Sequence, residues 1–366
     1  MGLETFWFVL IAVLWGGYFL LEGFDFGVGL LLPFLPRDEN QRATMFESIG
    51  PVWDGNEVWL VVAGGATFAA FPSWYATMFS GFYLALLLVL VCLIVRVVSF
   101  EWRSKSESTR WRRTWMWANA LGSFGASLIW GVGLSNLVNG VPLNSSGDFS
   151  GDFGDLFSVY TVVGGVAGVC VFTLHGATYL TIRTTGDLCE RSARAARRLS
   201  LLAALVGTAF LVWTVVVAVD RNSRSVFPPI LPAALGIAAV VLAVLLVHLH
   251  RGGLAFAATA LGAVLLVATL FTSLYPRVMV SSPDFANSLT VAGTASAHYT
   301  LKVMTIVALI LVPVILLYQA WTYHVFRRRV SRSQFEPAPP QPGTLPGPRR
   351  PAAATDDAPP PARRRT

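Results

Sequence analysis

The chain has 366 residues, of which 54% are hydrophobic and only 13% carry a charged side chain. A soluble domain carries roughly 25% charged residues, so this composition argues against a soluble protein and predicts an integral membrane protein. The formal net charge is +7, but the basic residues lie in short runs between apolar segments and in the tail. This distribution indicates membrane topology and argues against nucleic-acid binding.

Apolar stretches of about 20 residues are long enough to cross a hydrocarbon core about 30 Å thick. In chain order they are residues 5–32, 51–71, 76–99, 115–138, 157–181, 200–219, 229–249, 254–275 and 300–325. Each should be helical, because a lone span must satisfy its backbone hydrogen bonds internally. The first stretch lacks a preceding basic segment and a small-residue cleavage site, so we expect a retained span rather than a signal peptide.

The fold class expected is therefore an all-α integral membrane protein, with nine transmembrane helices arranged as two four-helix bundles and one peripheral helix. The odd-numbered connections and the C-terminal end are rich in arginine, whereas the even-numbered ones carry only Arg221, Arg224 and Arg277. By the positive-inside rule the N-terminus lies outside and the C-terminus in the cytoplasm. We expect residues 1–330 to form the membrane domain and residues 336–366, rich in Pro, Ala and Arg, to be a disordered cytoplasmic tail.

Carboxylates interrupt the first two apolar stretches: Glu22 and Asp25 in the first, and Asp54 and Glu57 at the start of the second. A charged side chain at the bilayer centre costs about 2.5–3.5 kcal/mol on insertion scales, so such residues usually have a function. With the orientation above, all four lie in the cytoplasmic half of the membrane, as does Arg96 in the third stretch. They are candidates for a proton-uptake path. The alternatives are a buried ion-pair network that fixes helix packing, or carboxylates close enough to the surface to stay hydrated.

The chain offers little evidence for a metal or haem site of its own. Its three cysteines (Cys92, Cys170 and Cys189) lack a metal-binding or disulfide spacing. His175 is the only histidine deep within a predicted span and could supply one axial haem ligand, but a hydrogen-bonded core residue is the favoured interpretation. We predict neither a catalytic residue nor a metal site in this chain.

Six groups of residues, taken in order, are distinctive. They are EGFDFGVG at 22–29, PVWDGNEVWL at 51–60, FSGFY at 79–83, RSK at 103–105 with RWR at 110–112, GATYL at 176–180, and NSLT at 287–290. Together they closely resemble subunit II of the cytochrome bd quinol oxidases, over about residues 5–330. The tail departs from the pattern of that family.

This resemblance implies a terminal respiratory oxidase of the bacterial cell membrane that oxidises quinol and reduces O₂ to water. It implies that haem b, haem d and the quinol-oxidising loop belong to the larger subunit I. The chain would then pack beside subunit I as a pseudo-symmetric partner, stabilise the haem assembly and contribute a proton route. A bound quinone or lipid in this chain, and small single-helix subunits as further partners, are left open.

Carried over by motif, Asp25 and Asp54 match the acidic positions of the family, with Arg96 near them. Glu22 stands where relatives commonly have Asp, and His175 stands where relatives have a polar amide, which argues against a haem role. The alternative is an independent proton-coupled transporter. It predicts inverted repeats and broken helices around a midplane site, neither of which is clear in the sequence. A third possibility is a purely structural scaffold.

Overall fold

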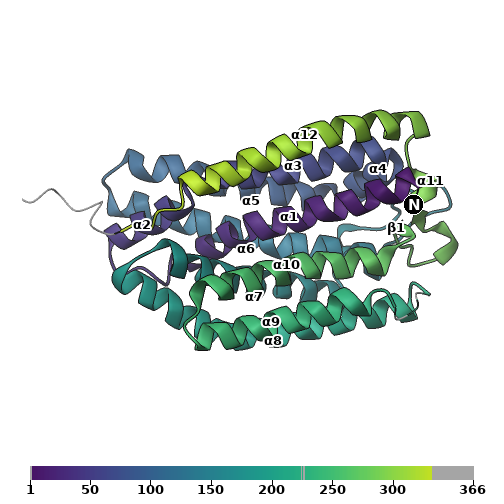
Figure 1. The fold of residues 1–366 in the computed structure, drawn as a ribbon. Helices are drawn as coiled ribbons and strands as arrows, with labels where there is room; N and C mark the ends of the chain where they lie inside the picture. Colours follow the sequence, from purple (N-terminus) through teal and green to yellow (C-terminus); the bar gives the residue numbers. More distant parts are fainter. Residues whose placement is uncertain (1, 224, 226, 332–366) are drawn as a thin grey trace, which may run out of the picture.

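The computed structural model describes residues 2–223, 225 and 227–331, so the predicted tail at 336–366 lies outside the described residues. Long apolar helices run side by side along most of this range (Figure 1). They are α1 (Leu3–Leu31), α3 (Trp53–Ala70), α5 (Tyr83–Trp102), α6 (Thr109–Asn139), α7 (Val159–Arg183), α8 (Gly186–Asp220), α9 (Ile230–His248), α10 (Gly252–Leu274) and α12 (His298–Val325).

Shorter elements connect these helices. They are α2 (Glu39–Ile49), α4 (Pro72–Gly81), α11 (Val291–Thr294), three 3₁₀ turns (Arg103–Lys105, Phe153–Leu156 and Phe285–Asn287) and two strands, β1 (Arg277–Met279) and β2 (Leu289–Thr290). The two strands pair antiparallel. The described part of the chain is thus mostly helical, as expected.

Among the described residues, eight helices are long and apolar enough to cross a membrane. This confirms the expectation of a helical membrane protein. The second predicted span corresponds to α3, which is not one of the eight. Its first five residues include Asp54, Asn56 and Glu57, and these residues lower its mean hydropathy.

Some predicted boundaries differ from the structure. The predicted span 76–99 begins too early, because α4 is a separate helix with Pro72 in its first turn and α5 begins only at Tyr83. Conversely, α8 begins at Gly186, well before the apolar stretch at 200–219, and carries the basic segment between them as helix. The short helix α2 lies between two predicted spans and is absent from the sequence prediction. Asp38 caps it by accepting a hydrogen bond from the backbone N–H of Gln41.

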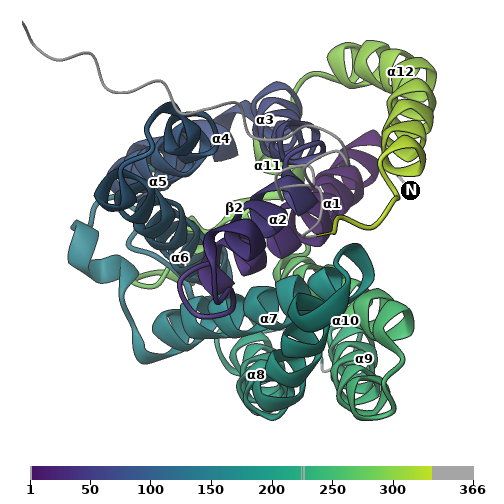
Figure 2. The ribbon, with the colours of Figure 1, turned by 90° about the vertical axis from the view of Figure 1, so that its left-hand side faces the viewer.

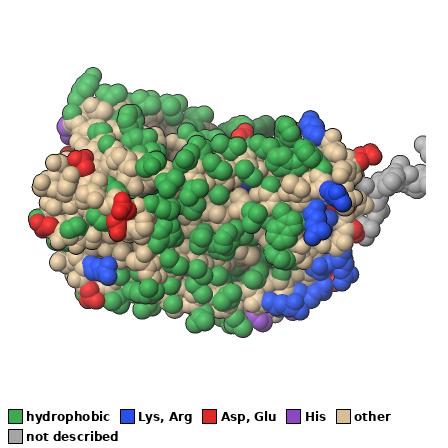
Figure 3. All heavy atoms as spheres, turned by 180° about the vertical axis from the view of Figure 1, so that it is seen from behind, with side chains coloured by type: hydrophobic (Ala, Val, Ile, Leu, Met, Phe, Trp, Pro, Cys, Tyr) green, Lys and Arg blue, Asp and Glu red, His purple; other side chains and the backbone are tan. Residues whose placement is uncertain are grey.

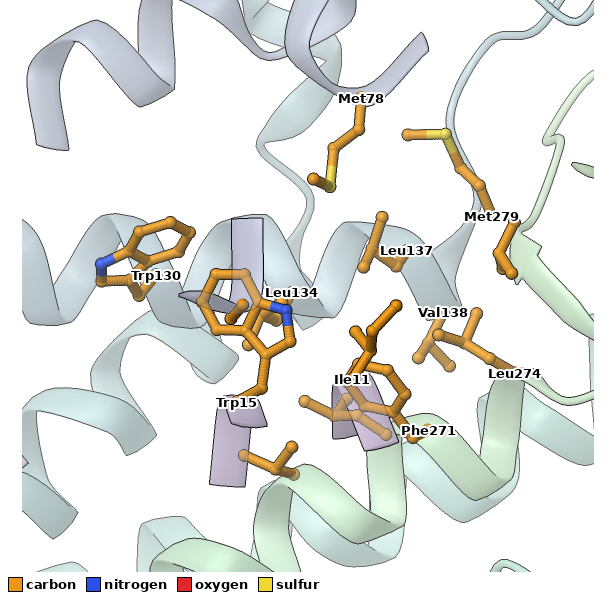
Figure 4. Packing of buried hydrophobic residues seen from close by; sticks show 14 of the residues in the cluster. Ile11, Trp15, Met78, Trp130, Leu134, Leu137, Val138, Phe271, Leu274 and Met279 are labelled. Carbon is orange, nitrogen blue, oxygen red and sulfur yellow. The ribbon is translucent and has the colours of Figure 1, made fainter. Parts of the chain in front are cut away.

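The end-on view in Figure 2 shows α7, α8, α9 and α10 grouped together, with α1 near the centre of the molecule and α12 at its edge. α1 contacts α3, α6, α7 and α10. Figure 4 shows part of the core around it, where Ile11 and Trp15 of α1 lie near Trp130 of α6 and Phe271 of α10. The Trp15 and Trp130 rings are 4.8 Å apart between centroids. The central position of α1 explains why its carboxylates are buried.

α1 and α7 approach each other very closely near these carboxylates. A Cβ atom added at Gly27 would lie 1.9 Å from the Phe172 carbonyl oxygen, and one at Gly176 would lie 2.3 Å from the Gly27 carbonyl carbon. Only glycine fits at either position without backbone movement. A Cβ atom added at Gly23, one turn earlier, would lie 2.8 Å from the Phe172 ring, so Gly23 and Gly27 both face α7.

The surface is divided along the helix direction. Figure 3 shows a broad band of hydrophobic side chains between two polar ends, with most Lys and Arg side chains at one end. Such a band matches a surface in contact with lipid tails.

Candidate functional site

Glu22 and Asp25 lie in the C-terminal third of α1, and neither side chain is exposed at all. They are three residues apart, so they lie on neighbouring positions of one helix surface. The two carboxylates also interact with each other electrostatically. Two acids thus share one buried region.

Arg96 of α5 supplies the positive charge of this region. Its Nη1 atom lies 2.5 Å from Glu22 Oε1, and both side chains are 0% exposed. The guanidinium carbon lies 5.1 Å from the centre of the Phe26 ring and 5.7 Å from that of Phe100. Aromatic faces and a carboxylate together stabilise the buried cation. Glu22, Asp25 and Arg96 are called the buried charge cluster below.

Asp25 is held by a hydrogen bond from α3. The Asn56 side-chain amide donates to Asp25 Oδ2 at 2.7 Å. The amide oxygen of Asn56 in turn accepts hydrogen bonds from the Tyr323 hydroxyl at 2.7 Å and the Gln319 amide at 3.3 Å. These contacts link Asp25 to α12 through Asn56, and they orient its carboxylate.

The buried charge cluster retains hydrogen-bonding capacity. Nε and Nη2 of Arg96 are buried and have no hydrogen-bond partner within the described part of the chain. Buried polar atoms of proteins nearly always bind a protein group or water. The cluster can therefore bind water beside its carboxylates.

Glu57 and Asp54 occupy different surroundings. Glu57 is partly exposed and interacts electrostatically with Arg96 and Asp54. Asp54 is exposed in the first turn of α3. The structure thus brings together Glu22, Asp25 and Arg96, with Glu57 at their edge, whereas Asp54 lies at the surface.

Three residues of this region were not among the sequence candidates: Asn56, Gln319 and Tyr323. Gln319 and Tyr323 are spaced four residues apart in an otherwise apolar helix. This spacing places two polar groups on one face and could have indicated a buried partner.

His175 does not offer a ligand for haem iron. Its Nε2 atom donates to the Leu20 carbonyl oxygen at 3.0 Å, and its Nδ1 atom lies 2.7 Å from the Thr259 hydroxyl. Its ring stacks on Phe256, with 4.7 Å between centroids. Both ring nitrogens are engaged, so neither is available to bind haem iron. Within residues 2–331 as described, no group of three or more His, Cys, Asp and Glu side chains could hold a metal.

The family model for cytochrome bd terminal oxidase subunit II matches residues 3–326. The chain belongs to this family. It is 39% identical to cytochrome bd ubiquinol oxidase subunit 2 of Bacillus subtilis strain 168 over 338 residues, which cover 91% of this chain and 98% of the relative. It is 38% identical over 367 residues to cytochrome bd-I ubiquinol oxidase subunit 2 of Escherichia coli K12, covering 91% and 97% respectively.

A solved structure supports the fold of this subunit II family member. The bd oxidase from Geobacillus thermodenitrificans contains a chain that matches with a TM-score of 0.71 at 19% identity, covering 87% of this chain and 98% of that one. At this identity the likeness concerns the fold alone.

Family membership confirms the resemblance read from the motifs. The chain is a subunit of a cytochrome bd-type oxidase, an oxidoreductase complex of the respiratory chain. As a subunit II it has a subunit I partner, and the complex contains haem. With its eight apolar helices, it is a multi-pass protein of the bacterial cell membrane.

Proposed function

We propose that the chain is the accessory subunit of a complex that oxidises quinol and reduces O₂ to water, and that it contributes to assembly and to a proton-uptake path from the cytoplasm. The curated relatives are named ubiquinol oxidase subunits, which supports quinol as the electron donor. Haem b, haem d and the quinol-oxidising loop then belong to the partner subunit. Because both ring nitrogens of His175 already have partners, it is not a candidate haem ligand in this chain.

The membrane arrangement proposed for this subunit has nine crossings, with the N-terminus outside and the C-terminus in the cytoplasm. α3 provides the ninth crossing, since it packs along α1 (Figure 2). The grouping of α7 to α10 (Figure 2) supports one four-helix bundle. The second bundle would consist of α1, α3, α5 and α6, and α12 would be the peripheral helix. We also keep as predictions that this subunit binds a quinone or lipid and that small single-helix subunits join the complex.

One observation carries the proton-uptake proposal: two fully buried carboxylates share a single buried arginine, which pairs with Glu22 and interacts electrostatically with Asp25. If both acids are ionised, Arg96 neutralises only one of them. The second acid can then gain a proton without leaving the guanidinium unpaired. Within a membrane, such a group is well suited to relay protons.

The contacts suggest the order of the relay. Glu57 is partly exposed and lies at the edge of the buried charge cluster, so it is the entry group on α3. Asp25 follows, oriented by Asn56. Glu22, paired with Arg96, is the deepest acid from the cytoplasmic end. O₂ reduction in the partner subunit consumes protons, and these residues would supply them.

The test is turnover of the assembled Asp25→Asn complex. We expect quinol-dependent O₂ consumption to fall by about tenfold if this is the sole path, because an amide cannot relay a proton. Subunit content and the reduced-minus-oxidised haem spectrum check assembly first. Glu101→Gln, which changes an exposed carboxylate beyond the cluster, should keep normal turnover.

The Asp25→Asn/Asp54→Asn double variant separates the proton path from the scaffold alternative. Normal turnover in a fully assembled double variant would refute proton uptake through these acids and leave an assembly role. The transporter alternative loses support, because the family match covers nearly the whole membrane domain.

A further inference from the structure

A cavity of about 580 Å³ lies between the inner end of α1 and the N-terminal part of α8, on the basic end of the molecule. Four of its lining residues are arginines: Arg37, Arg191, Arg194 and Arg198. Most of the remaining lining is apolar. The cavity is separate from the buried charge cluster and shares no residue with it.

Three of these arginines are arranged by the helix itself. Arg191, Arg194 and Arg198 belong to α8, and their spacing of three and four residues places them on one face. Arg37 comes from the connection between α1 and α2. Basic side chains from two separate parts of the chain therefore line one cavity.

Carboxylates of the chain neutralise this charge only in part. Arg37 lies 3.6 Å from Asp187, and Arg194 lies 3.6 Å from Glu190, and all four side chains are at least 41% exposed. Long, exposed pairs of this kind are weak.

The other two arginines are not engaged by carboxylates. In the described ranges, neither Arg191 nor Arg198 forms an ion pair, and the buried Nη1 atom of Arg191 has no hydrogen-bond partner. The cavity therefore presents guanidinium groups that can bind an anion.

A second basic cavity provides a contrast. It has a volume of about 610 Å³ and is lined by Arg42, Arg112 and Arg113, but also by Glu39 and Glu107. Glu39 pairs with Arg42 at 2.9 Å and also contacts Arg112. Carboxylates of the protein thus neutralise part of the positive charge of this second cavity, whereas Arg191 and Arg198 in the first cavity have no such partner among the described residues.

The apolar lining of the first cavity is continuous with the apolar face of α8 that follows Arg198. Leu31, Phe34 and Leu199 line it, and Phe34 is 70% exposed. Beyond Arg198, the same face of α8 carries Leu201 and Leu205, which are 64% and 71% exposed. An anion that also has an apolar tail fits both parts of this surface.

We propose that this cavity binds an anionic phospholipid, with its phosphate on Arg191 and Arg198 and an acyl chain along Leu201 and Leu205. Guanidinium groups bind phosphate oxygens through paired hydrogen bonds. Basic pockets between helices on the cytoplasmic side suit such headgroups. Inorganic phosphate has no tail to use the leucine face.

Native mass spectrometry of the detergent-solubilised complex tests this proposal. Wild-type complex and an Arg191→Gln/Arg198→Gln variant are titrated with cardiolipin, phosphatidylglycerol and phosphatidylcholine. We expect the variant to lose one bound anionic lipid, with affinity at that site lowered by roughly tenfold to thirtyfold, since each basic residue near the surface contributes a separate attraction. Phosphatidylcholine should bind weakly to both.

A Lys105→Gln/Arg110→Gln variant is the matched control, because it removes two exposed positive charges from the same end of the molecule outside both cavities. It should bind lipid like the wild type. Single Arg198→Gln, a change at an exposed position, should show a smaller loss in the same direction.

Equal lipid binding by wild type and the Arg191→Gln/Arg198→Gln variant would overturn the proposal. So would equal losses in the control variant, which would indicate a general charge effect. Displacement of the lipid by millimolar inorganic phosphate would show an anion site that does not use the acyl chain, and would overturn the assignment to a phospholipid.

Discussion

Arg96 and Glu22 form a pair in which each residue depends on the other. Both side chains are fully buried. Among the described residues, no other carboxylate lies within ion-pair distance of Arg96. A buried ion pair contributes little net stability, but removal of one partner leaves an uncompensated charge. The pair therefore constrains which substitutions α1 and α5 can accept.

Glu22→Gln should destabilise the complex by at most about 3–5 kcal/mol, because Arg96 would lose its ion-pair partner in a buried site and only more distant acids such as Asp25 would offset its charge. The expected result is a lower yield of assembled complex and a lower unfolding temperature, measured by thermal unfolding of the purified complex. Glu22→Asp keeps the charge with a shorter side chain and should lose less. Glu47→Gln, at an exposed position, is the control. Wild-type stability of Glu22→Gln would show that the ion pair does not support the fold.

The acids of the site could be predicted from the sequence, because a carboxylate in an apolar stretch is costly and conspicuous. Their partners were harder to find. Asn56 is 31 positions from Asp25, and Tyr323 is 267 positions from Asn56. Uncharged polar residues are common in membrane helices, so hydropathy alone does not reveal such pairs. The sequence also does not distinguish exposed Asp54 from buried Asp25, because hydropathy does not show which face of a helix points into the protein.

At the scale of elements, the contact between α1 and α7 determines where the acids lie. Gly27→Ala should disrupt assembly, because its Cβ atom would meet the α7 backbone at Phe172 and Gly176. Overpacking of this kind costs about 1–3 kcal/mol, occasionally more. Subunit content after purification measures the effect.

Gly64→Ala in α3 is the matched control for this change, since in the described structure no atom outside its own stretch of helix lies within 4 Å of the added Cβ. It should assemble normally. If Gly27→Ala and Gly64→Ala assemble equally well, the close approach of α1 and α7 is not required.

The boundaries of elements were predictable where hydrophobicity changes sharply. The stretch at 229–249 corresponds to α9 (Ile230–His248), and 254–275 corresponds to α10 (Gly252–Leu274). The basic beginning of α8 and the polar helix α2 were missed, because a search for apolar stretches does not detect helices rich in polar and charged residues. The break between α4 and α5 was missed because both sides of it are apolar.

At the scale of the whole molecule, the lipid cavity and the buried charge cluster lie toward the same end of the α1 helix as the basic connections. Figure 3 shows the corresponding gathering of Lys and Arg side chains at one end of the surface. If this end faces the cytoplasm, the acids of α1 can draw protons from there, and the arginines meet the anionic lipids of the inner leaflet. Both proposals therefore depend on one orientation.

Labelling of single cysteines in intact cells tests this orientation. The background has Cys92, Cys170 and Cys189 replaced by alanine, since all three are free thiols. One labelled position is Ser145→Cys, in the exposed connection between α6 and α7. The other is Ser108→Cys, at the exposed residue directly before α6. We expect a membrane-impermeant maleimide to label Ser145→Cys in intact cells and Ser108→Cys only after the membrane is opened, because the arginine-rich connection faces the cytoplasm. The two positions flank a single span, so each serves as the control for the other. The reverse labelling pattern would place the entrance of the proton path outside the cell, contrary to uptake from the cytoplasm.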